Sequence, residues 1–107
     1  MKILLDESLP VRLKSLPWNK HPIFSVRDMG WLGKKNGELI RLMVEHEFDV
    51  FVTADRSVSY QQNIASINIS IAVLCGVNNR METYAALIPK LLKLLQEIPL
   101  PKVIEVK

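Results

Sequence analysis

The sequence is poor in the residues that build special sites, and it has no long hydrophobic run. It contains one cysteine, Cys75, which excludes an intrachain disulfide and a zinc site built from cysteines. No apolar stretch approaches the roughly 18 residues of a membrane span. The acidic pair Asp6-Glu7 comes too early for a secretory signal. The sequence therefore predicts a cytoplasmic protein without a membrane span.

The composition is that of an ordinary globular domain. Hydrophobic residues make up 49% of the 107 residues and charged residues 23%, which excludes disordered and fibrous classes. A chain of this length buries about two thirds of its unfolded surface around one core, so we expect a single domain over residues 1–107. The net charge of +3 is compatible with a nucleic-acid partner but does not indicate one.

Short apolar runs alternate with segments of helical periodicity, which predicts an α/β fold. We expect a three-layer α/β/α sandwich around a mainly parallel sheet of four to five strands. The expected strands are 3–5, 23–26, 49–53, 69–74 and, at an edge, 103–106. The expected helices are 9–16, 36–47, part of 57–67, and 81–98. Ser8 is the expected N-cap of the first helix and Asn36 that of the second. The last helix begins with the capping pair Asn79 and Glu82, and it kinks or is divided into two helices at Pro89.

Acidic residues follow three of the expected strands. Asp6 and Glu7 follow the first strand, Asp28 the second and Asp55 the third. Because the carboxyl ends of parallel strands meet at one edge of a sheet, we expect these acids there, with Glu38 in the first turn of its helix. Clustered carboxylates repel one another unless a cation lies among them, and Mg²⁺ and Mn²⁺ prefer oxygen ligands. Asp6, Asp55 and Glu38 are therefore candidate metal ligands and catalytic residues. Glu7 and Asp28 are candidates for supporting these ligands or for binding the substrate.

Each of these acids also has an ordinary structural explanation. Asp6 and Asp55 could be turn or cap residues, and Glu38 could complement the positive end of its helix. Glu7 and Asp28 could be solvated. Asp6 and Asp55 together make a stronger indication of a site than either residue alone.

Basic residues lie close to the acidic ones in the sequence. Lys34 and Lys35 follow Trp31 in a loop that could follow phosphates and stack a base. The same loop could be a solvated turn whose tryptophan packs on the core. Arg56, next to Asp55, could bind a phosphate or form a local pair.

Five blocks along nearly the whole chain carry a family resemblance through their joint order. They are KILLDESLP (2–10), SVRDMGW (25–31), NGELI (36–40), VFVTADR (50–56) and YQQN (60–63). In these blocks the chain resembles bacterial and archaeal PIN-like domain proteins. These proteins are a small class of unknown function related to PIN-domain nucleases and to VapC-type toxins.

The resemblance implies a parallel α/β/α domain with an acidic pocket that binds Mg²⁺ or Mn²⁺ and hydrolyses RNA. Asp6 matches the acid after the first strand, Asp55 the acid after the third, and Glu38 the acidic motif at the helix start. Arg56 or a loop lysine such as Lys35 would hold a phosphate. Toxin-like relatives are encoded beside a small antitoxin protein, so RNA and an antitoxin that fills the pocket are the implied partners.

The chain also departs from the family pattern at two positions. Asn36 stands where many relatives have an aspartate, and Ser57 stands where many have a second acid. Asparagine can still bind a metal through its carbonyl oxygen, but it brings no charge. These differences support an alternative, a catalytically degenerate PIN-like module that binds a protein or RNA partner.

One further function and one question of assembly stay open at the level of sequence. A phosphoacceptor receiver-type domain would also have acids after its first and third strands, as Asp6-Glu7 and Asp55 are here. Against it, Cys75 and Gly76 bring no hydroxyl after the fourth strand, and no lysine-proline pair follows the fifth strand, because Lys102 comes before it. The long apolar stripe from 81 to 98 is more than one core needs, which leaves a homodimer open.

Overall fold

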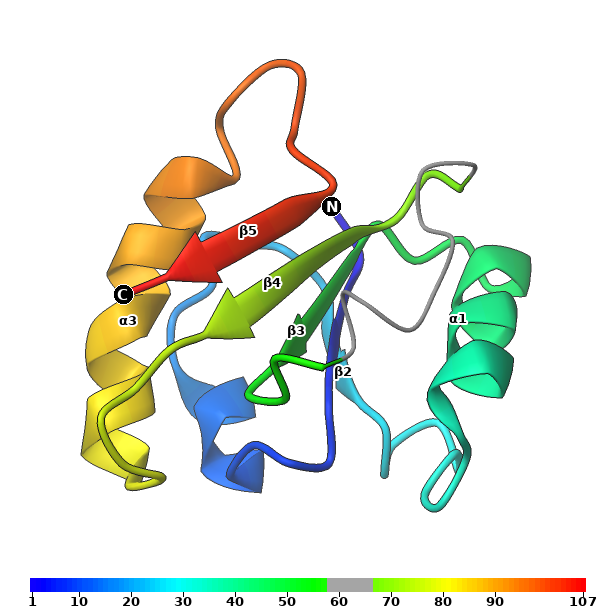
Figure 1. Ribbon diagram of the computed structural model, residues 1–107, viewed down its shortest axis with the longest axis horizontal. Coiled ribbons are helices and arrows are strands. Elements are labelled where there is room, and N and C mark those ends of the chain that lie inside the picture. The colour runs from blue at the N-terminus through cyan, green and yellow to red at the C-terminus, as the bar shows by residue number, and fades with distance from the viewer. Residues whose placement is uncertain (58–66) are drawn as a thin grey trace.

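Five parallel strands form one sheet in the computed structural model, which describes residues 1–57 and 67–107. The order across the sheet is β2-β1-β3-β4-β5, and every neighbouring pair is parallel (Figure 1). The strands are β1 (Ile3–Leu5), β2 (Ile23–Ser25), β3 (Val50–Thr53), β4 (Ser70–Leu74) and β5 (Val103–Val106). The predicted α/β class, the parallel sheet and the edge position of the last strand are confirmed.

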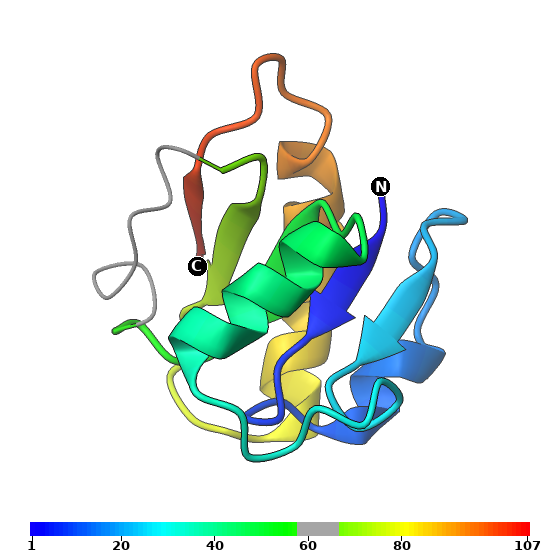
Figure 2. The same ribbon diagram turned by 90° about the vertical axis from the view of Figure 1, so that its right-hand side faces the viewer.

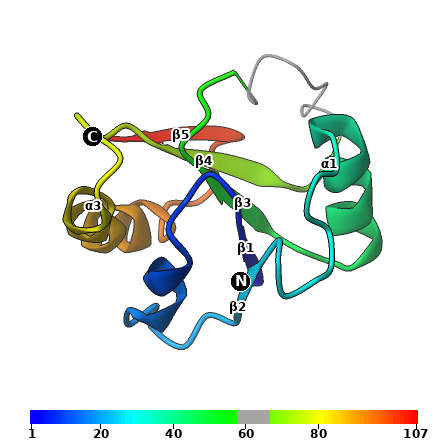
Figure 3. The ribbon, with the colours of Figure 1, turned by 90° about the horizontal axis from the view of Figure 1, so that it is seen from below.

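Two α-helices cover opposite faces of this sheet in the part of the chain that the structure describes. Figure 2 shows α1 (Asn36–Glu45) in front of one face, and Figure 3 shows α3 (Met81–Leu94) on the other side of the sheet. A 3₁₀ helix, η1 (Val11–Ser15), lies on the same side as α3 and contacts it. None of the described helices has the length and apolar character needed to cross a membrane.

The three central strands β1, β3 and β4 are buried on both faces. In β1, Ile3 and Leu5 belong to the hydrophobic cluster that packs against α3, whereas Leu4 between them belongs to the cluster under α1. The same alternation occurs in β3, where Phe51 faces α1 and its neighbours face α3. Because successive side chains of a strand point to opposite faces, a strand between two helical layers reads as an unbroken apolar run.

The stripe of α3 is used by the core of one chain. Its buried members are Tyr84, Leu87, Ile88, Leu91 and Leu92. Helix α3 is continuous through Pro89 and ends at Leu94, so the predictions of two helices and of an end at 98 are wrong, and the alternative of a kink at Pro89 stays a prediction. The homodimer stays a prediction, without this stripe as its argument.

The helix starts differ from those expected. Pro10 precedes η1, and the Ser8 hydroxyl donates to Asp6 instead of capping a helix. Helix α1 begins at Asn36 itself, so its cap position falls on Lys35, one residue earlier than expected, and no side chain caps it. At α3 the cap position is Arg80, not Asn79, and no side chain caps it. Asn78 lies two residues before Arg80, and its Oδ1 accepts from the Arg80 amide at 3.0 Å and from the Thr83 hydroxyl at 2.6 Å. The expected helix 57–67 lies almost wholly outside the described residues.

The direction in which successive strands are added across the sheet reverses between β1 and β3. From β1 the chain moves outward to β2, and it then returns past β1 to β3 and continues to β4 and β5. The loops that follow β1 and β3 therefore leave the sheet side by side and diverge. In open α/β sheets, ligands bind in the crevice at such a point, outside the carboxyl ends of the strands.

Candidate functional site

Asp6 and Asp55 lie at the carboxyl ends of the adjacent strands β1 and β3. Asp6 follows β1 directly, and its amide donates to the Val52 carbonyl at 2.9 Å, which extends the pairing of β1 with β3 by one residue. Asp55 comes two residues after the end of β3. The carboxyl edge faces the viewer in Figure 3. The expectation that these two acids share this edge is confirmed.

Thr53, the last residue of β3, joins the two acids. Its side chain is fully buried, and its hydroxyl donates to Asp6 Oδ2 at 2.7 Å. The same Oγ1 accepts the Asp55 amide at 3.0 Å. One buried hydroxyl therefore fixes the Asp6 carboxylate and the backbone of Asp55 relative to each other.

Ser8 and Glu7 complete the surroundings of the Asp6 carboxylate. The Ser8 hydroxyl donates to Oδ2 at 2.7 Å, and it accepts the Ala54 amide at 3.3 Å, which is a second link between the loops after β1 and β3. The Glu7 amide donates to Oδ1 at 2.8 Å. Asp6 thus accepts three hydrogen bonds, and none of them comes from a cationic side chain.

Asp55 is an exposed carboxylate held by Ser57. Its Oδ1 accepts from the Ser57 amide at 2.9 Å and from the Ser57 hydroxyl at 2.7 Å. Ser57 stands where many of the PIN-like proteins that the sequence resembles have an acid, and here it orients Asp55 instead of adding a charge. We call Asp6, Ser8, Thr53, Asp55 and Ser57 the central network.

The central network fits a loosely held divalent cation better than a fully enclosed one. An ionised carboxylate offers about four lone-pair positions, so three hydrogen bonds do not exhaust Asp6. Mg²⁺ keeps several waters and is often bound by only one or two carboxylates. However, the described residues contain no group of three or more His, Cys, Asp or Glu that could hold a metal ion. Asp6 and Asp55 are the two carboxylates that the central network offers to a cation.

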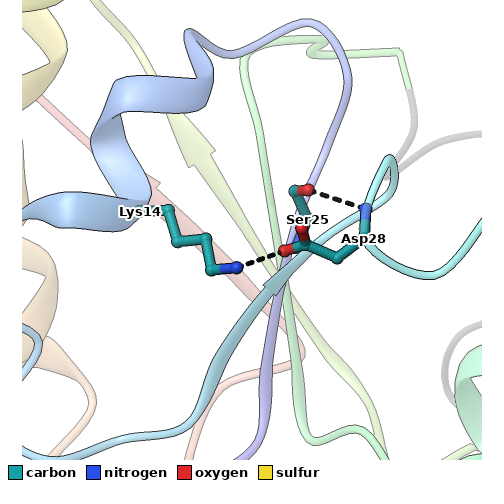
Figure 4. Close-up of polar contacts among 3 residues, drawn as sticks. All are labelled: Lys14, Ser25 and Asp28. Atoms are coloured by element: carbon teal, nitrogen blue, oxygen red, sulfur yellow. Dashed lines mark hydrogen bonds and ion pairs between the residues drawn. The ribbon is translucent and has the colours of Figure 1, made fainter.

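Asp28 has a different environment, although it follows the neighbouring strand β2. Its Oδ2 lies 2.6 Å from the Lys14 ammonium and accepts the Ser25 amide at 2.8 Å, while its own amide donates to the Ser25 hydroxyl at 3.0 Å (Figure 4). The hydrogen bond from Lys14, followed by that from the Ser25 backbone, lowers the pKa of Asp28 below its ordinary value. Asp28 therefore ties η1 to β2.

Glu38 is paired with a lysine of the loop that precedes its helix. It lies in the first turn of α1, and Oε1 is 3.3 Å from the Lys34 ammonium four residues earlier. Glu7, in contrast, is exposed and lines a hollow next to Asp6. The structure thus brings Asp6 and Asp55 together through Thr53, and it gives Asp28 and Glu38 lysine partners.

The basic loop before α1 does not offer a stacking platform. Trp31 is only 7% exposed, and its ring packs edge-on against His46 at 5.1 Å and Phe48 at 5.9 Å between centroids. The idea that Trp31 stacks a base is therefore wrong, and the alternative that it packs on the core is confirmed. Lys35 is exposed directly before α1, Asn36 is its first residue, and Arg56 is exposed beside Asp55.

Sequence reasoning missed Thr53 and gave Ser8 the wrong role. Thr53 is the only polar residue in a four-residue strand that is otherwise apolar, and it stands next to Asp6 in register because Leu5 pairs with Val52. A hydroxyl at the end of a buried strand, beside an acid that ends the neighbouring strand, is a signal that could have been used.

Comparison of the chain with protein-family models, with curated proteins and with solved structures finds no match.

Proposed function

We propose that the chain is a PIN-like domain that hydrolyses RNA with the help of a Mg²⁺ or Mn²⁺ ion held by Asp6 and Asp55. The observation that carries the proposal is the Thr53 hydroxyl, which links the Asp6 carboxylate to the backbone amide of Asp55 at the point where the strand order of the sheet reverses. The family resemblance of the five sequence blocks supports it, as does the arrangement of helices on both faces of a parallel sheet. A small antitoxin protein belongs among the partners to be sought.

In this proposal the residues of the central network have separate tasks. Asp6 and Asp55 hold the cation, which supplies a Lewis acid beside the phosphodiester. Thr53 and Ser8 keep the Asp6 carboxylate in one orientation, and Ser57 does so for Asp55. Arg56 and Lys35 lie in the loops after β3 and before α1, where they can bind phosphate oxygens. Glu38 is assigned to the rim of the site because Lys34 is its partner.

Titration with Mn²⁺ by calorimetry tests the proposed metal site without any choice of substrate. We expect Asp6→Asn and Asp55→Asn each to weaken Mn²⁺ binding by at least about tenfold. The matched controls are Asp28→Asn and Glu38→Gln, which remove the same single charge at the same edge and should change affinity by less than about threefold. A folded wild-type protein that binds no Mn²⁺, or equal losses in all four variants, would contradict the proposal.

The second candidate is a PIN-like module that binds a partner without cleaving RNA. The absence of a third acid in the described part of the central network favours it, together with Asn36 and Ser57. Incubation of the wild-type protein and Asp6→Asn with labelled total RNA in Mn²⁺ separates the two functions. Cleavage that Asp6→Asn removes supports the nuclease, whereas metal binding without cleavage supports the module.

A third candidate gains some support from the strand order. The order 2-1-3-4-5 is the flavodoxin-like order, which a phosphoacceptor receiver-type domain would share. Asp55 would then be the phosphoacceptor, but β4 is followed by Cys75 and Gly76, without a hydroxyl, and Lys102 precedes β5. Incubation with acetyl phosphate and Mg²⁺ tests this candidate, and an unchanged intact mass would dispose of it.

A further inference from the structure

A small hollow lies beside Asp6 on the side away from Asp55. Its walls come from the segments after β1 and after β2, and its volume is about 40 Å³. Asp6 and Glu7 line one wall and Arg27 lines the other. The hollow thus brings a basic residue to the central network from a loop that the sequence reasoning had not connected with it.

Arg27 differs from the lysines around it in its partners. Lys14 is paired with Asp28, and Lys34 with Glu38. Within residues 1–57 and 67–107, the Arg27 guanidinium forms no ion pair, and its side chain is exposed. A guanidinium that forms no ion pair, next to a site for a cation, is suited to bind a phosphate with two parallel hydrogen bonds.

Two exposed apolar side chains stand on the walls of the same hollow. Val11 of η1 is 59% exposed and Leu32 is 46% exposed, and they come from opposite walls. A volume of about 40 Å³ has room for a few water molecules or for phosphate oxygens, but not for a nucleobase. A base would therefore lie across the mouth of the hollow, on Val11 and Leu32.

We propose that this hollow binds one nucleotide of a single-stranded RNA, with Arg27 on the phosphate and Val11 and Leu32 under the base. The inference rests on the proposed function, because it supplies the nuclease site with a neighbouring substrate position. Single-stranded RNA is favoured over a duplex because only an unstacked base can lay its face on apolar side chains. The mixed lining matches a nucleotide, which has a charged phosphate and an apolar base face.

The test measures binding of a fluorescein-labelled single-stranded oligouridylate by anisotropy in EDTA, where the metal-dependent reaction is suppressed. We expect Arg27→Gln to weaken binding by about tenfold and to lower the slope of log affinity against log salt by about one. Leu32→Ser should weaken binding by about threefold without changing that slope. Controls are Arg12→Gln, an exposed arginine of η1 outside the hollow, and Val44→Ser, an exposed valine of α1; both should bind within about twofold of wild type.

Other results would overturn the inference. Equal losses in Arg27→Gln and Arg12→Gln would show only a general charge effect, and unchanged affinity in Leu32→Ser would remove the base position. Equally tight binding of a double-stranded RNA, or no binding of the oligouridylate by wild type, would also contradict it. Mn²⁺ calorimetry keeps the two proposals apart. Loss of the metal site with Arg27-dependent RNA binding retained would refute the nuclease alone, whereas the reverse result would refute the hollow alone.

Discussion

Four of the five acids expected at the carboxyl edge of the sheet fall into two kinds. Asp6 and Asp55 are surrounded by hydroxyls and backbone amides, which orient a carboxylate but leave its charge uncompensated. Asp28 and Glu38 each lie against a lysine, which cancels the charge locally. The comparison teaches that position at the carboxyl edge of a strand does not by itself make a metal ligand. The partners of the carboxylate decide whether it has charge to offer a cation.

The two kinds also differ in their connection to the core. The central network is built on Thr53, which is fully buried at the end of β3, so its geometry is set by the sheet. The Lys14–Asp28 pair joins two surface segments, and the side chains are 44% and 34% exposed. Breaking the central network is therefore expected to lower the free energy of unfolding strongly, whereas breaking the Lys14–Asp28 pair is expected to lower it only a little.

The largest effect in this comparison is expected from Thr53→Val. The change keeps the shape but removes the hydroxyl, so a buried donor to Asp6 and a buried acceptor for the Asp55 amide are lost together. We expect the free energy of unfolding to fall by about 2 kcal/mol, measured by urea denaturation.

Two variants control for this result. Thr53→Ser keeps the hydroxyl and should recover most of the loss. Thr83→Val removes a hydroxyl that donates to Asn78 at the surface and should cost about 1 kcal/mol or less. If Thr53→Val and Thr83→Val were equally stable, the central network would not be tied to the core as argued.

The fold followed from the sequence to a large extent because burial on both faces leaves a strong pattern. A run such as Val50-Phe51-Val52 is typical of a strand between two helical layers, and all five expected strands occur within about a residue of their predicted bounds. The helix starts were harder to predict. A serine or asparagine before an apolar stripe reads as a cap, but at Ser8 a carboxylate two residues earlier competes for the hydroxyl.

The candidate site was predictable only in part. Asp6 and Asp55 could be brought to one edge by the parallel topology alone. The lysine partner of Asp28 could not be predicted, because Lys14 is fourteen residues earlier and reaches Asp28 only through the packing of η1 beside β2. Thr53 was missed because its polar side chain lies in a strand that reads as pure core.

A smaller effect is expected from Asp28→Asn. The pKa of Asp28 is lowered from its ordinary value of 3.8 mainly by Lys14, so the folded state binds the proton less readily than the unfolded chain. Its stabilisation is therefore fully present above pH 3.8 and is lost as the pH falls through the lower, folded-state pKa. Since the pair is partly exposed, we expect the variant to lose about 0.5 kcal/mol at neutral pH.

Unfolding of wild type and Asp28→Asn across the acid range checks this sign. The two free energies should converge as the pH drops below 3.8, and Lys14→Met should show the same convergence. A difference that grows on acidification would mean that Asp28 is destabilising where it lies, and the contrast with the central network would lose its second half.

The smallest effect is expected from Glu38→Gln, and it sharpens the comparison most directly. Glu38 pairs with Lys34 at 3.3 Å along the start of α1, an arrangement that contributes about 0.3–0.5 kcal/mol and is screened by salt. We expect a slightly lower melting temperature at low salt, and no difference from wild type at high salt. Because the lysine already compensates the charge of Glu38, Mn²⁺ affinity should stay within about threefold of wild type. A loss of Mn²⁺ binding as large as that of Asp6→Asn would move Glu38 into the metal site, and the division of the four acids into two kinds would fail.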